Sequence, residues 1–173
     1  MTLKLIGAAL VILSCSLFGF YQAAQFANRP KQVRQLVAAL QRLETEIWYG
    51  HAPLPDALRK IGEQIPEPLK LIFTTAAQRL TDAKGLSTQE SWQQAIEEHW
   101  KSTAMKQNEK NILHQFGFSL GTSDRNDQIK HIRLAVGQLQ HEETAAFDEQ
   151  ARYEKMSRSL GLLAGALIVI LMF

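Results

Sequence analysis

Histidines and carboxylates are the side chains of this sequence that could support metal or acid–base chemistry, so their spacing is the first test for an enzyme. The five histidines are spread along the chain, at His51, His99, His114, His131 and His141. No two of them share a helical face at i,i+4 with a carboxylate, which is the arrangement of a zinc metalloprotease. The chain also has a single cysteine, which excludes a disulfide framework and a cysteine-based zinc site. The spacing therefore predicts no metal site.

Two pairs of adjacent carboxylates, Glu97-Glu98 and Glu142-Glu143, are the remaining candidates for acid–base chemistry. Adjacent residues on a helix point about 100° apart, so solvated surface explains both pairs better than a catalytic site. The segment from Ser119 to Asp124 could surround a nucleophile, but the end of one helix followed by the start of the next explains it fully. A glycine-rich phosphate loop is absent. We therefore predict no catalytic residue, no cofactor and no enzyme.

The charged residues are concentrated in the middle of the chain, because residues 5–28 and 159–173 contain none. The first run is long enough to cross a hydrocarbon layer of about 30 Å as a helix. Two alternatives stay open for it, a cleaved signal peptide and a lipoprotein signal that ends at Cys15. The second run reaches only about 22 Å as a helix, so it spans with help from its flanks or is a buried core helix.

Basic residues flank both apolar runs on the side of the middle segment. They are Arg29, Lys31, Arg34, Arg42, Arg152, Lys155 and Arg158. Because basic flanks stay in the cytoplasm, we expect membrane spans at residues 1–28 and 158–173, a cytoplasmic helical domain at 29–157, and both termini outside. The totals of 19 basic and 17 acidic residues give no indication of nucleic acid binding.

Every strong periodic signal in the middle segment is helical. Apolar residues follow one helical face over residues 33–47, 69–80, 92–100 and 108–120, and prolines open a short helix at 56–61. Ser87 and Glu90 are typical of a capping box, and Gly50, Gly85 and Gly121 of helix ends.

The last helix begins after Ser123 or Asp124 as its cap and has no clear stop before the end of the chain. Its predicted apolar stripe contains Ile129, Ile132, Val136, Leu139 and Phe147. The sequence therefore predicts an all-α protein. We expect a six-helix cytoplasmic bundle flanked by N- and C-terminal transmembrane helices, with the last helix long and continuous into the membrane.

Four segments of the chain carry a resemblance to a known family. They are Leu43 to Gly50, Gln89 to Trp100, Leu120 to Leu134 and Tyr153 to Gly165. In these segments the sequence resembles the stage III sporulation protein AB family. The stretch from Tyr49 to Leu58 is also similar to the cytoplasmic helical domains of type II secretion platform proteins. The resemblance implies a non-enzymatic platform or adaptor in the channel complex between mother cell and forespore, located in the mother-cell membrane that surrounds the forespore.

The resemblance also implies partners: a cytosolic secretion-type ATPase and other stage III sporulation membrane proteins. Between residues 44 and 149 sixteen acidic side chains outnumber eleven basic ones, which fits a basic partner and fits ordinary scatter of charge over exposed helix faces equally well. The hypothesised contact residues lie in the dense polar segment after Gly121 and are Asp124, Asp127, Gln128 and His131. A structural alternative is that Asp124 is a helix cap and His131 a packed, hydrogen-bonded helix residue. The alternative function is a membrane-tethered enzyme or signalling module of unknown substrate.

Small residues recur at intervals of four in both apolar runs. Gly161 and Gly165 do so in the second run, and Cys15, Gly19 and Ala23 in the first. In lipid, small side chains allow helix backbones to approach closely. We therefore expect the two spans to pack on each other, or the second spans to pair between subunits of a homo-oligomer.

Overall fold

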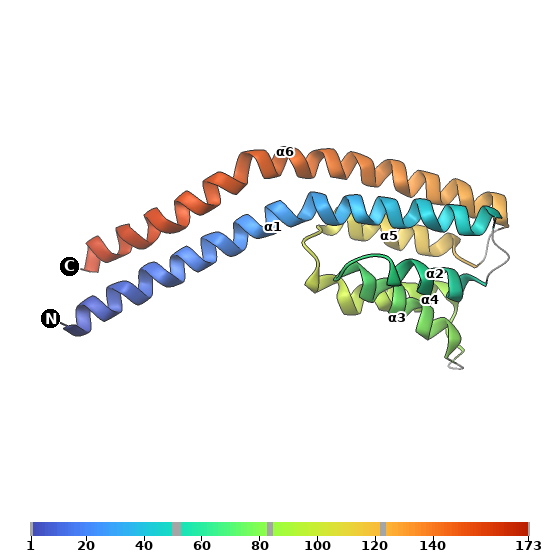
Figure 1. The fold of residues 1–173 in the computed structure, drawn as a ribbon, viewed down its shortest axis with the longest axis horizontal. Coiled ribbons are helices and arrows are strands. Elements are labelled where there is room, and N and C mark those ends of the chain that lie inside the picture. Colours follow the sequence, from blue (N-terminus) through green and yellow to red (C-terminus); the bar gives the residue numbers. More distant parts are fainter. Residues whose placement is uncertain (1, 50–52, 83–84, 122–123, 173) are drawn as a thin grey trace. The chain divides into compact units, whose positions relative to one another are not determined.

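The structure is a computed structural model that describes residues 2–49, 53–82, 85–121 and 124–172. For residues 2–6, 8–12, 15–16, 154–155, 157–162 and 164–172 it describes the backbone alone. These ranges contain six α-helices, a short 3₁₀ turn and no β-strand, which confirms the all-helical prediction (Figure 1). The helices are α1 Thr2–Tyr49, α2 Leu54–Glu63, α3 Leu69–Thr81, α4 Thr88–His99, α5 Gln107–Ser119 and α6 Arg125–Met172, with the 3₁₀ turn at Trp100–Ser102.

The chain forms two compact units. One unit comprises residues 1–30 and 145–173, and the other, which we call the bundle, comprises residues 31–144. The two long helices α1 and α6 contribute residues to both units. Among the residues whose side chains the structure describes, no helix has the length and apolarity that crossing a membrane requires. Most side chains of the two predicted spans lie outside the described ones.

Helix α1 continues through Pro30, so the first predicted span and the first predicted bundle helix are one helix. A proline inside a helix removes one backbone hydrogen bond and usually bends or ends the helix. Here contacts hold the residues before and after it. The ring of Phe26 lies 5.7 Å from that of Tyr153, and the Gln32 side chain accepts a 2.7 Å hydrogen bond from the Ala104 amide. Tertiary packing therefore overrides the local signal.

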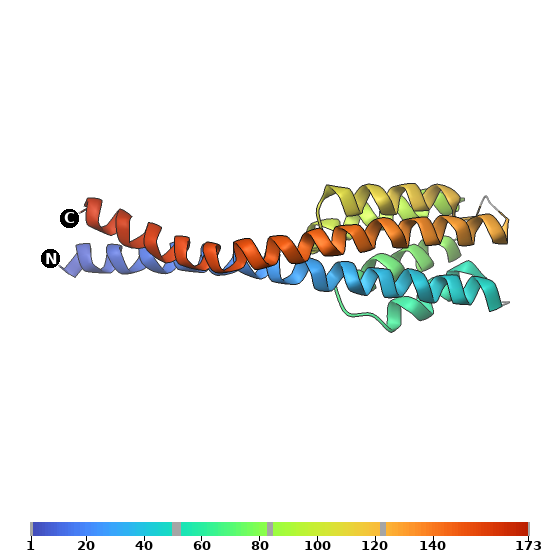
Figure 2. The ribbon, with the colours of Figure 1, turned by 90° about the horizontal axis from the view of Figure 1, so that it is seen from above.

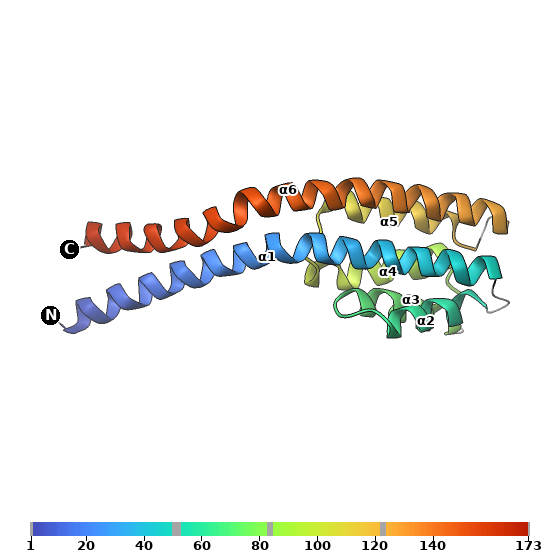
Figure 3. The same cartoon turned by 45° about the horizontal axis from the view of Figure 1, so that its top comes forward.

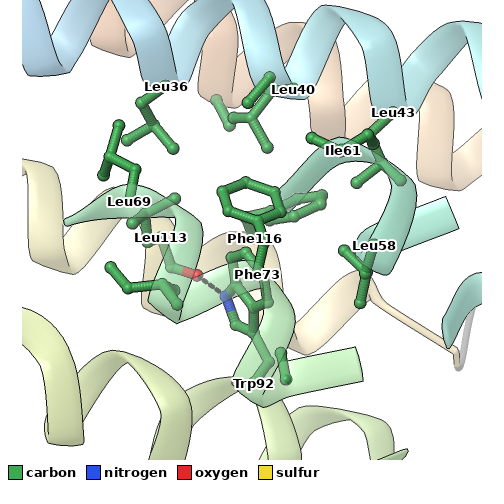
Figure 4. Close-up of a cluster of buried hydrophobic side chains, with 14 of the residues drawn as sticks. Leu36, Leu40, Leu43, Leu58, Ile61, Leu69, Phe73, Trp92, Leu113 and Phe116 are labelled. Carbon is green, nitrogen blue, oxygen red and sulfur yellow. Dashed lines mark hydrogen bonds between the residues drawn. The ribbon is translucent and has the colours of Figure 1, made fainter. Parts of the chain in front are cut away.

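Trp92 on α4 is among the largest fully buried side chains of the bundle core (Figure 4). Its indole makes edge-to-face contacts with Phe73 at 5.4 Å and with Phe116 at 5.6 Å. The indole Nε1 donates a 2.8 Å hydrogen bond to the carbonyl of Leu113, so the buried polar atom is satisfied. The apolar stripes predicted for α1, α3, α5 and α6 converge on this core.

Helix ends in the bundle follow the predicted capping chemistry. The Ser87 hydroxyl accepts from the Glu90 amide at 3.1 Å, and the Glu90 carboxylate accepts from the Ser87 amide at 2.9 Å, which confirms the capping box. The hydrogen bond from the Ser87 backbone also lowers the pKa of Glu90. Helix α5 ends before Gly121, whose φ of +79° favours glycine. Helix α3, in contrast, ends at Thr81, before the predicted stop at Gly85.

The apolar stripe predicted for the last helix is correct up to Leu139 and wrong at Phe147. Ile129, Ile132, Val136 and Leu139 are buried, whereas the Phe147 residue is 40% exposed. Ala146 takes the buried position, because a spacing of seven residues from Leu139 keeps it on the same helix face. In the bundle, α5 runs alongside the first part of α6 (Figures 2 and 3).

Candidate partner-binding surface

The first turns of α6 carry the predicted contact residues, and Asp124 begins them as a helix cap. Its side-chain Oδ1 accepts a 2.8 Å hydrogen bond from the Asp127 amide, and its carbonyl accepts one of 2.9 Å from the Gln128 amide. A side-chain oxygen at this position satisfies an amide that has no partner within the helix. The structural role proposed for Asp124 is therefore present, and its carboxylate remains exposed to solvent.

The helix brings Asp124, Asp127 and His131 onto one face, because their spacing is i, i+3 and i+7. Asp127 forms an exposed 3.5 Å ion pair with Lys130, and Gln128 is half-buried. His131 is exposed, so the alternative that placed it as a packed helix residue is wrong. The four predicted residues are thus neighbours on the surface of α6, three of them open to solvent.

Helix α1 ends at the same end of the bundle at which α6 begins (Figures 1 and 3), and the last two residues of α1 are exposed aromatic residues. Trp48 is 49% exposed and Tyr49 is 78% exposed, with the two rings at 6.4 Å in an edge-on arrangement. The 2.7 Å contact between Arg133 and Glu44 ties α6 to α1 near this end. We call the surface formed by Trp48, Tyr49 and the first two turns of α6 the distal surface.

A second polar cluster joins α4 to α5. The Glu97 carboxylate accepts a 2.8 Å hydrogen bond from Lys110 Nζ and lies 3.2 Å from His114 Nε2. The hydrogen bond from Lys110 lowers the pKa of Glu97, and the charge of His114 adds to this effect. Glu98 pairs with Arg79 at 2.6 Å. Both carboxylates are thus exposed and engaged in ion pairs between helices, as solvated surface residues are.

The described residues offer no metal centre, because no three His, Cys, Asp or Glu side chains among them are placed to hold an ion. Two of the surface depressions in the described bundle are grooves open to solvent, lined by amide, apolar and charged side chains. A third, of about 290 Å³, is lined mainly by polar side chains, among them Arg79, Asp82, Glu98 and His99, and His99 Nε2 lies 2.8 Å from the Thr75 hydroxyl.

In the unit that comprises residues 1–30 and 145–173, the first part of α1 lies antiparallel to the last part of α6. Arg29 donates a 2.6 Å hydrogen bond to Glu149, and Phe26 contacts Tyr153. Ala23 is 1% exposed, and Gly19 is also buried, which fits helices that approach closely on their small residues. The predicted packing residues Gly161 and Gly165 lie outside the residues whose side chains are described.

Sequence reasoning missed the exposed aromatic residues of the distal surface. Trp48 and Tyr49 follow directly after the apolar stripe of α1, so the pattern assigned them no role of their own. The signal that could have revealed them is two large aromatic side chains after the last stripe residue, Ile47, where only one helical face can be buried.

Comparison with known proteins agrees with the resemblance seen in the sequence. The family described as Stage III sporulation protein AB (spore_III_AB) matches residues 4–173. The stage III sporulation protein AB of Bacillus subtilis (strain 168) is 41% identical over 170 residues, which cover 98% of this chain and 99% of that protein. A solved structure of stage III sporulation protein AB (SpoIIIAB) is 40% identical, has a TM-score of 0.68, and covers 72% of this chain and 98% of its own. On both full-length sequence and fold, the chain belongs to the stage III sporulation protein AB family.

Proposed function

We propose that this protein acts during stage III of sporulation as a non-enzymatic membrane platform, and that its bundle docks a cytosolic secretion-type ATPase through the distal surface. The observation that carries the proposal is the exposure of Trp48 and Tyr49, the last residues of α1, at the end of the bundle where α6 begins with the exposed Asp124 and Asp127. Tryptophan and tyrosine are enriched among the residues that dominate binding energy at protein interfaces. The acidic flank favours a partner with a basic contact surface.

The family membership supports a role in sporulation, because the matched relatives bear that name. The two larger grooves of the bundle, which are open to solvent, support an adaptor. The alternative, a membrane-tethered enzyme or signalling module, calls for a polar pocket with converging titratable groups, and the depression lined by Arg79, Asp82, Glu98 and His99 is the candidate site for it. In the proposed assembly the protein holds the ATPase at the membrane and transmits its position or motion to the channel between mother cell and forespore. Other stage III sporulation membrane proteins are the proposed neighbours.

The proposed location is the mother-cell membrane around the forespore, with the bundle in the cytoplasm and both termini outside. The uncharged runs at residues 5–28 and 159–173 support it. Large apolar side chains exposed along α1 also support this location, because apolar side chains are more stable in contact with lipid than with water. They are Leu13, Leu17, Phe18, Phe20 and Tyr21, each between 58% and 67% exposed.

The docking proposal is tested by co-purification of the ATPase with the full-length protein from detergent-solubilised sporulating cells. In the test variant, Asp124→Asn keeps a capping side chain while Asp127→Lys reverses a charge. A second variant carries Trp48→Ala and Tyr49→Ala. Each variant should weaken binding about tenfold or more, because interface anchors of this kind contribute over 1 kcal/mol each.

A matched control applies the same charge changes to exposed acids elsewhere in the bundle, with Asp82→Asn and Glu63→Lys. It should bind the ATPase as the unmodified protein does. If both test variants melt normally and still retain the ATPase, the contact does not lie on the distal surface and the docking proposal is wrong.

The proposed topology is tested in vegetative cells, whose outer face meets the medium, after Cys15 is replaced by serine. Cysteines introduced at Thr2 and after Phe173 should react with an impermeant thiol reagent in intact cells. A cysteine at Gln107, which is exposed on the bundle, should react only after lysis. Labelling at Gln107 in intact cells would overturn the cytoplasmic assignment. Retained membrane anchoring in the Cys15→Ser protein would exclude the lipoprotein alternative.

A further inference from the structure

A surface groove runs between α5 and the first part of α6, and nothing in the described chain covers it. Its larger part has a volume of about 660 Å³ and continues into a smaller part of about 240 Å³. Both parts are lined by Ile112, Gln115, Leu134 and Gln138. The walls are two facing helical stripes, residues 108, 111, 112 and 115 on α5 and residues 134, 137, 138 and 141 on α6. We call this feature the α5/α6 groove.

Gly137 lies in the middle of the α6 stripe, and the packing within the chain does not explain it. A Cβ atom added there would meet nothing within 4 Å. Glycine inside a helix is less favourable than alanine, because it costs more backbone entropy. One turn away, Leu134 is 59% exposed. Because Gly137 has no side chain, the backbone of another helix could approach α6 closely at this point. The exposed Leu134 side chain could then pack into the surface of that second helix's subunit.

The charges of the groove argue against a charged occupant. Arg133 already pairs with Glu44 at 2.7 Å, and Glu142 accepts a 3.0 Å hydrogen bond from Asn108. A charged segment placed there would lose hydration and gain no unpaired counter-ion in return.

The same lining is complementary to a copy of itself. Apart from Arg133, Glu142 and His141, the side chains that line the larger part of the groove are amide or aliphatic. Amides such as Asn111, Gln115 and Gln138 both donate and accept hydrogen bonds, so they can pair with identical residues. A two-fold contact brings the same patch together from both subunits, and it therefore requires a surface that does not repel itself.

We propose that a second copy of this chain occupies the α5/α6 groove. The two α6 helices cross about a two-fold axis at Gly137, and Leu134 of each chain enters the groove of the other. This contact lies in the bundle. It adjoins the distal surface at His131, which lines the smaller part of the groove, and it is separate from the pairing of apolar ends considered above. It does not depend on the proposed function.

The first test is disulfide crosslinking of the full-length protein, purified in detergent with Cys15→Ser. Because the two Gly137 positions meet at the axis, their Cα atoms should lie within the roughly 4–7 Å that a disulfide allows. Gly137→Cys should therefore give a covalent dimer under mild oxidation. The matched control is Gln41→Cys, which is also exposed but lies on α1 outside the groove, and it should stay monomeric.

The second test measures the dimer dissociation constant by sedimentation velocity. Leu134→Glu and Gly137→Gln should each raise it about tenfold or more, because they place a charge or a long side chain at the centre of the contact. Neither change should lower the melting temperature of the monomer, since both positions are open to solvent.

Three outcomes would overturn the proposal. The full-length protein could remain monomeric at every concentration, which leaves the groove to a different protein. It could dimerise with no response to either substitution, as expected for association through the apolar ends. It could also crosslink through Gln41→Cys but not through Gly137→Cys.

Discussion

The guanidinium group of Arg29 on α1 donates a 2.6 Å hydrogen bond to the carboxylate of Glu149 on α6, and the two residues are 120 positions apart in the sequence. The Arg29 side chain is 5% exposed and that of Glu149 is 30% exposed. A charge this deeply buried is tolerated because its partner lies within hydrogen-bond distance. The pair therefore ties the two long helices together within one unit of the chain.

Removing one member of this pair should destabilise the protein more than removing both. Glu149→Gln removes the carboxylate charge beside the buried guanidinium and should lower the free energy of unfolding by about 3 kcal/mol. Arg29→Met together with Glu149→Leu should cost less, because no uncompensated charge remains. Thermal unfolding of the full-length protein in detergent, followed by circular dichroism, measures both. Additive effects of the two sites would show that the residues do not interact energetically.

Gly117→Ala should destabilise the bundle core. An added Cβ would lie 2.5 Å from Cδ1 of Trp92, so the indole must move and its hydrogen bond to the Leu113 carbonyl must lengthen. Overpacking of this kind costs about 1–3 kcal/mol. The midpoint of urea unfolding should therefore fall with an unchanged slope.

The matched control for this change is Gly137→Ala, measured at a protein concentration that gives a monomer. An added Cβ there meets nothing within 4 Å, and alanine favours helix by up to about 1 kcal/mol over glycine. Its midpoint should stay the same or rise. An equal fall for both alanine variants would contradict the steric explanation.

Glu97 should contribute to stability at neutral pH and lose this contribution in acid. The hydrogen bond from Lys110 lowers the pKa of Glu97 below its ordinary value of 4.5. A depressed folded-state pKa stabilises the fold above the unfolded-state value, and the benefit disappears as the pH falls from about 4.5 through the folded-state pKa. The unmodified protein and Glu97→Gln should thus differ in stability near pH 7 and converge in acid.

The control for the pH experiment removes the cause of the shift. In a Lys110→Met background, Glu97→Gln should change the acid limb of the stability curve less than it does in the unmodified protein. Parallel curves for the unmodified protein and Glu97→Gln over the whole pH range would show that this carboxylate does not couple to folding.

The apolar ends should pack on each other in the register set by two contacts. Arg29 with Glu149 and Phe26 with Tyr153 define an antiparallel alignment that, extended by whole turns, brings Cys15 opposite Ala164. A cysteine at Ala164 should form a disulfide with Cys15. One at Leu171 should not, because it lies about 10 Å further along the helix.

Gly161→Ile with Gly165→Ile should preserve membrane insertion, since both changes raise hydrophobicity, and should weaken that crosslink. Unchanged crosslinking in the double variant would show that Gly161 and Gly165 do not form a packing interface.

Much of the bundle could be predicted from local patterns. The capping box at Ser87, the left-handed glycine at Gly121 and the proline-opened helix α2 rest on backbone chemistry within a few residues, so they can be recognised without knowledge of the fold. The predicted contact residues Asp124 and Asp127 were placed correctly on the first turns of α6, because a cap and its spacing fix their position. Their binding role remains a proposal.

Most of the helices and most of their apolar faces followed from residues close together in the chain, and the family followed from four segments spread along the sequence. Tertiary structure alone decided that α1 continues through Pro30, that Ala146 and not Phe147 is buried, and that Trp48 and Tyr49 remain exposed. It also brought α5 beside α6 to form the groove around Gly137. These features depend on which helices become neighbours, and packing between segments far apart in the sequence is strong enough to outweigh the local preference of a single proline or phenylalanine.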